Sequence, residues 1–82
     1  MRDDELLLTT LTAYQRMKLA EKEKKGYKDW VDEDLWDLVQ WLDREVDELK
    51  LALITPREKE EVWREAADVA NLAAMIAQKI GR

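Results

Sequence analysis

Apolar residues recur every three or four positions in the first third of the chain, about residues 3–24, which is the spacing of one helix face. They are Leu7, Leu8, Leu11, Tyr14 and Met17. Lys18 falls on the same face and interrupts it. Gly26, which tolerates positive φ, is a natural stop. We therefore expect an N-terminal helix over about residues 3–24.

A second stripe begins after the loop 26–30 and predicts another helix, with Asp29 or Asp32 as its N-cap. At about 100° per residue, its apolar positions fall within a face roughly 100° wide. They are Leu35, Leu38, Val39, Leu42, Val46, Leu49 and Leu53.

A third helix is predicted to start at Thr55-Pro56-Arg57-Glu58, where Thr55 suits the N-cap, Pro56 the first turn and Glu58 a capping box. Glu65 interrupts its apolar face, and Gly81 ends it. The apolar positions are Val62, Val69, Leu72, Ala73, Ile76 and Ile80. Alanines at many other positions make this a slim helix that a neighbour can approach closely.

Three amphipathic helices without strand-like alternation predict an all-α fold in a single domain, 1–82. We expect two long antiparallel helices plus the N-terminal helix. A chain of 82 residues without cysteine has a small core and no disulfide. We therefore expect oligomerisation to complete a core of the four-helix-bundle type.

Charge and composition exclude several classes of function. A net charge of −5 argues against a nucleic-acid polymer or an anionic membrane as partner. No apolar run approaches the roughly 18–20 residues of a membrane span, and the N-terminus is too acidic for a signal peptide, so a cytoplasmic protein is expected. The absence of His and Cys excludes the common catalytic triads and zinc sites.

Two acidic pairs, Glu45 with Glu48 and Glu65 with Asp68, carry the candidate chemistry. Each pair has the spacing i, i+3, which places both members on one side of a helix. Glu45 should lie nearer the core and Glu48 further out. Antiparallel neighbouring helices would bring four carboxylates together, and a hard divalent cation is the usual remedy for their repulsion. A solvated helix face is the alternative for either pair alone.

The motif Glu-x-x-Glu, a gap of 16 residues, and Glu-x-x-Asp resembles the signature of the MazG-like all-α nucleoside triphosphate pyrophosphohydrolases. The flanking residues of 41–49 and 65–73 are similar to the two family motifs, and the aromatic loop 26–30 also looks like family members. The likeness covers about residues 26–77. One departure is Arg44, which stands where the family usually has a further Glu.

The resemblance implies cleavage of a nucleoside triphosphate, with ribose or deoxyribose, into monophosphate and pyrophosphate. It also implies Mg²⁺ (or Mn²⁺) as cofactor and a homodimer or homotetramer. Carried over by position, Glu45, Glu48, Glu65 and Asp68 would be the metal ligands, and Asn71 would contact the nucleotide. Many relatives have a further C-terminal helix or basic tail, so phosphate binding here is expected to use other residues, including those of a second subunit.

Further roles follow from this chemistry. Glu45 or Glu48 would orient or deprotonate the attacking water. The base would stack on Trp30, Trp41 or Tyr14. The phosphates would meet basic residues of the first helix and its loop. These are Arg16, Lys18, Lys22, Lys25 and Lys28.

Several alternatives stay open. Lys18 either meets phosphate or extends from the edge of the core into solvent. Asn71 either contacts the ligand or is a polar interface residue. For the whole chain, the alternatives are a non-catalytic helical dimerisation or regulatory module and a related phosphoribosyl-nucleotide pyrophosphohydrolase.

Overall fold

The computed structural model describes residues 2–26, 30–55 and 58–81, and within these ranges it contains helices and no strand. The elements are α1 (Asp3–Lys24), the short 3₁₀ helix η1 (Trp30–Asp32), α2 (Leu35–Ile54) and α3 (Lys59–Gly81). The all-α prediction with three long helices is therefore confirmed.

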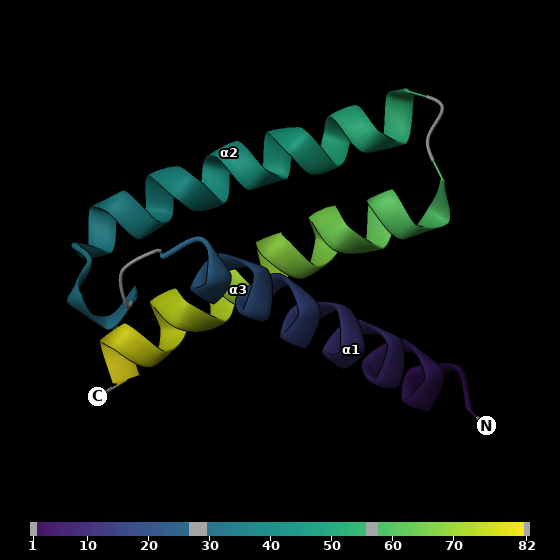
Figure 1. The fold of residues 1–82 in the computed structure, drawn as a ribbon, viewed down its shortest axis with the longest axis horizontal. Coiled ribbons are helices and arrows are strands. Elements are labelled where there is room, and N and C mark those ends of the chain that lie inside the picture. The colour runs from purple at the N-terminus through teal and green to yellow at the C-terminus, as the bar shows by residue number, and fades with distance from the viewer. Residues whose placement is uncertain (1, 27–29, 56–57, 82) are drawn as a thin grey trace.

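Helix α3 is the centre of the arrangement, because both α1 and α2 pack against it. Helices α2 and α3 run antiparallel as a long hairpin, and α1 crosses α3 (Figure 1). The C-terminal half of α1 meets the middle of the hairpin, whereas its N-terminal end points away from α2 (Figure 1).

The C-terminal end of α1 and the start of α2 follow from local chemistry. Gly26, just after the C-cap Lys25, has φ 77°, so the predicted stop of the first helix is confirmed. The N-cap of α2 is Asp34, whose side chain accepts a hydrogen bond from the backbone N–H of Trp36 at 3.1 Å. The predicted cap at Asp32 is wrong because that residue belongs to η1, and Asp29 lies outside the described residues.

The third helix begins later than its sequence predicts. Thr55 is the C-cap of α2, with its backbone N–H bonded to the Leu51 carbonyl. Helix α3 begins at Lys59, and the Glu58 carbonyl just before it accepts hydrogen bonds from the N–H groups of Glu61 and Val62. Thr55 thus closes the preceding helix instead of opening the next, and Pro56 lies outside the described residues.

The core lies between α2 and α3, where Leu38, Leu72 and Met75 are buried against one another. Trp30, Leu42 and Ile76 pack around them. Several predicted core positions are exposed instead: Leu7, Leu8, Met17, Leu53, Ala73 and Ile80. The leucines of α1 are exposed because its N-terminal half extends beyond the hairpin, and the positions on α2 and α3 lie at helix ends or away from the shared face.

No helix within the described residues is long and apolar enough to cross a membrane. Assembly into a four-helix core remains a prediction.

Candidate functional site

Three of the four predicted acids converge between α2 and α3. One carboxylate oxygen from each of Glu45, Glu65 and Asp68 lies within 4.8 Å of the others. Glu45 comes from α2, and the other two come from successive turns of α3. The antiparallel packing of the two helices therefore places Glu45 opposite Glu65 and Asp68, and we refer to these three residues as the acid cluster.

Asp68 is the most deeply placed acid of the cluster, with only 5% of its surface exposed. Its Oδ1 atom is buried and has no hydrogen-bond partner among the described residues. Leaving a charged oxygen desolvated and unpaired is costly. This oxygen therefore suits a ligand that supplies positive charge.

The electrostatics of the cluster are those of crowded acids. Partial burial, reinforced by the charges of Asp68 and Glu65, raises the pKa of Glu45 to about 6. Partial burial also raises the pKa of Glu65, with contributions from Asp68 and Glu48. Both shifts mean that the ionised forms are disfavoured in the metal-free protein, and a bound cation would reverse this preference.

Glu48 occupies a different position from the other three. Its side chain is exposed on α2 and does not belong to the acid cluster. It nevertheless lies close enough to raise the pKa of Glu65. The sequence pattern placed Glu45 nearer the core than Glu48, and the structure confirms that order.

Lys18, the residue that interrupts the apolar face of α1, lies beside the acid cluster. The Nζ of Lys18 lies 3.3 Å from Oδ2 of Asp68 and 3.5 Å from Oε2 of Glu21. The guanidinium of Arg64 in turn donates to both carboxylate oxygens of Glu21, at 2.8 and 2.9 Å. The ion pairs thus link α1 to α3, and the hydrogen bonds to Arg64 lower the pKa of Glu21.

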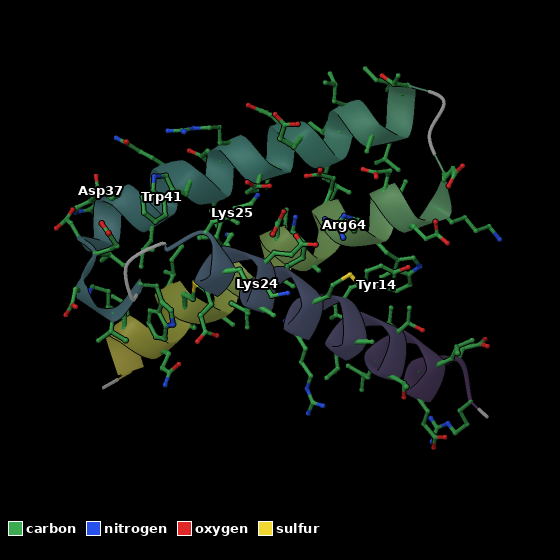
Figure 2. The ribbon with its side chains drawn as sticks, in the orientation of Figure 1. Tyr14, Lys24, Lys25, Asp37, Trp41 and Arg64 are labelled. Carbon is green, nitrogen blue, oxygen red and sulfur yellow. The ribbon has the colours of Figure 1, made fainter. Side chains whose placement is uncertain are left out.

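A cavity of about 660 Å³ adjoins the acid cluster and shares Glu45 with it. Its walls include the aromatic residues Trp30 and Trp41 and the basic residues Lys22 and Arg44. Figure 2 shows Trp41 towards the start of α2, well separated from Arg64 on α3. The volume lies in the range of small-molecule sites, and the walls offer an aromatic surface and positive charge beside the acids.

The turn that carries Trp30 is fixed by a contact from α3. The ammonium group of Lys79 donates to the backbone carbonyl of Val31 at 2.8 Å. This bond ties η1 to the last turns of α3 and so holds one wall of the cavity.

Other predicted residues have structural partners. The amide of Asn71 donates to the Gln15 carbonyl at 3.3 Å, which places it in the α1–α3 interface. The ring of Tyr14 stacks on Trp63, with centroids 6.0 Å apart and planes at 9°. Figure 2 shows Tyr14 on α1 near Arg64. Lys28 lies outside the described residues, and Arg16 and Lys25 are exposed away from the cavity lining.

Sequence reasoning missed Glu21 and Arg64, which organise the lysine, and Arg44 as part of the cavity wall. Arg64 stands one turn before Asp68 on the same helix face, and this spacing is the only signal that was available. Its bond to Glu21 joins residues 43 positions apart, which no local pattern reveals.

Comparison of the chain with protein-family models, with curated proteins and with solved structures finds no match. The MazG-like resemblance therefore remains a prediction that rests on the motif residues.

Proposed function

We propose that this protein is a divalent-metal-dependent nucleoside triphosphate pyrophosphohydrolase that releases nucleoside monophosphate and pyrophosphate. The observation that carries the proposal is the convergence of Glu45, Glu65 and Asp68, with an oxygen of Asp68 buried and unpaired. Oxygen-only ligands of this kind suit Mg²⁺ or Mn²⁺. The cavity beside Glu45 gives a nucleotide a place next to the acids.

The acid cluster would hold the cation, and Glu48, whose charge contributes to the raised pKa of Glu65, would be the fourth ligand. When bound, the cation neutralises the acids and polarises the phosphate oxygens. The charge of the leaving pyrophosphate would be balanced by Lys22 and Arg44 in the cavity wall.

The aromatic residues Trp30 and Trp41 would hold the base by stacking, since every base offers a π face. The triphosphate would then lie between the aromatic walls and the acid cluster. Tyr14 is assigned no such role, because its ring already stacks on Trp63.

Glu45 is the better placed general base. It belongs to both the acid cluster and the cavity wall, so it is the cluster acid that borders the proposed nucleotide site. In the reaction, the oxygen of water bonds to the α-phosphorus while the bond to the bridging oxygen of the β-phosphate breaks. The electron pair of that bond leaves with pyrophosphate, and the proton of the water passes to the carboxylate.

The test is direct. The purified protein is incubated with Mg²⁺ and a panel of ribo- and deoxyribonucleoside triphosphates, and monophosphate and pyrophosphate are quantified. The Glu48→Gln and Glu45→Gln variants should lose about 10²-fold or more in kcat, as expected for loss of an acid that acts in the transition state.

The matched control is Asp47→Asn, which also removes one negative charge from α2 but lies on its exposed side. It should retain activity. Hydrolysis that survives both glutamate variants, or the absence of pyrophosphate with every nucleotide, would contradict the proposal.

The second candidate, a non-catalytic helical interaction module, is favoured by the exposed leucines of α1 and by the ion pair between Lys18 and Asp68. Such a protein needs no metal, because Lys18 already partly balances the acids. The same assay separates the two candidates: a module would release no pyrophosphate while remaining folded.

A further inference from the structure

Lys18 is held more tightly than a surface lysine. Its side chain is 17% exposed, and its partner Asp68 has a side chain that is 7% exposed. Their ion pair lies at the inner edge of the acid cluster, where solvent screens charge weakly. Among the ion pairs of the described residues, the pair of Lys18 with Asp68 is the one that includes a member of the acid cluster.

Glu21 is an alternative ion-pair partner for Lys18. Its carboxylate already receives two hydrogen bonds from Arg64, so it is held in place without Lys18. The Lys18 ammonium lies 3.5 Å from this carboxylate and 3.3 Å from Asp68. A small rotation of the lysine side chain therefore moves the ammonium from Asp68 towards Glu21 without leaving it unpaired.

The three acids carry a formal charge of −3, and one ammonium balances only part of it. Oδ2 of Asp68 faces Lys18, whereas the buried Oδ1 has no hydrogen-bond partner among the described residues. A divalent cation bound to Asp68 would lie beside the Lys18 ammonium, and these two positive charges would repel each other strongly. Metal and lysine therefore compete for the same carboxylate.

We propose that Lys18 is the internal counter-cation of the acid cluster in the metal-free protein, and that a divalent cation binds by displacing it from Asp68 towards Glu21. The inference rests on the proposed function only in its use of the cluster as a metal site. It makes Lys18 a residue that sets the metal affinity and stabilises the metal-free fold.

The test uses Mn²⁺ alone, with affinity measured by isothermal titration calorimetry and the unfolding temperature measured with and without the ion. Lys18→Met keeps the aliphatic part of the side chain and removes the charge. It should bind Mn²⁺ about tenfold more tightly, in the range of coupling between contacting charges. Its metal-free form should unfold at a lower temperature, and Mn²⁺ should raise that temperature more than in the native protein.

Lys22→Met is the matched control. Lys22 also favours the ionised form of Glu45 through its charge, but it has no ion pair with Asp68. Its removal should change Mn²⁺ affinity by less than about twofold, because a partly exposed charge is screened. An equal gain in both variants would mean a general charge effect and would overturn the proposal.

Lys18→Arg covers the case in which Lys18→Met does not fold. A guanidinium keeps the charge and binds a carboxylate more strongly than an ammonium does. Mn²⁺ should therefore bind to Lys18→Arg more weakly than to the native protein. Tighter Mn²⁺ binding to Lys18→Arg, or unchanged or weaker binding to a folded Lys18→Met, would overturn the inference while leaving the proposed function standing. If the native protein takes up no Mn²⁺, even with nucleotide present, the proposed function fails as well.

Discussion

Glu45 links the acid cluster to the pH dependence of stability. Its pKa is about 6 in the folded protein, against an ordinary value of 4.5. Between pH 4.5 and 6, the folded state therefore keeps a proton on Glu45 that the unfolded state has released. The free energy of unfolding of the metal-free protein should therefore fall as pH rises through this window. The shift corresponds to about 2 kcal/mol at most, and solvent screening of this partly exposed group reduces it to about 1 kcal/mol.

Urea denaturation in chelator from pH 4.5 to 7 measures this trend. The free energy of unfolding should fall less steeply with pH in Glu45→Gln than in the native protein. Some fall should remain, because the raised pKa of Glu65 acts in the same direction. Glu21 has a lowered pKa and loses its contribution only at lower pH, outside the window. Added Mn²⁺ should reverse the slope, since it binds the ionised acids. Parallel profiles for the native protein and Glu45→Gln would contradict this account.

For single residues, local spacing predicted where the acids of the cluster lie but not which residues they contact. The i, i+3 pattern and the apolar stripes place Glu45, Glu65 and Asp68 on facing sides of two helices, because both depend on the helical repeat. The position of Lys18 against Asp68 depends on how α1 crosses α3, which is a matter of tertiary packing. For the same reason, the bond between Asn71 and the Gln15 carbonyl was beyond prediction.

Among the elements, the start of α2 offers a test of what fixes a helix end. Asp34 accepts the N–H of Trp36, whereas the predicted cap, Asp32, lies within η1. Asp34→Ala should lower the free energy of unfolding by about 1 kcal/mol, the usual cost of losing an N-cap. Chemical denaturation measures the loss.

Asp32→Ala is the control, since Asp32 is also an exposed acid close to the same helix. It should leave stability within about 0.5 kcal/mol of the native value. A larger loss in Asp32→Ala than in Asp34→Ala would mean that the cap predicted from sequence is the effective one.

Helix ends were predictable where a single residue determines them and uncertain where several compete. Gly26 ends α1 as predicted, because few other residues adopt its positive φ without strain. Between α2 and α3, by contrast, Thr55 serves equally well as the last residue of one helix or the cap of the next. The structure uses it for the first purpose, since Leu51 offers a carbonyl to its N–H.

For the whole molecule, the small core and the exposed apolar surface both lead us to expect that the chain associates with a second copy. Only five apolar residues are buried among those described, and Leu6, Leu7 and Leu8 of α1 are each more than half exposed. We propose that a second copy of the chain covers this part of α1 and completes a four-helix core, because apolar surface left in water favours association. The mass measured by light scattering should be at least twice the 9.7 kDa of one chain.

Leu8→Glu tests whether these leucines make the contact. Leu8 is 60% exposed in the single chain, so the substitution should not disturb its fold. A charge at a buried subunit contact is strongly unfavourable, so the variant should run as a 9.7 kDa monomer at concentrations where the native chain associates. Thr9→Glu adds the same charge at the adjacent exposed position of α1 and should still associate. A native chain that remains monomeric, or a Leu8→Glu variant that associates as the native chain does, would show that the exposed leucines do not hold two copies together.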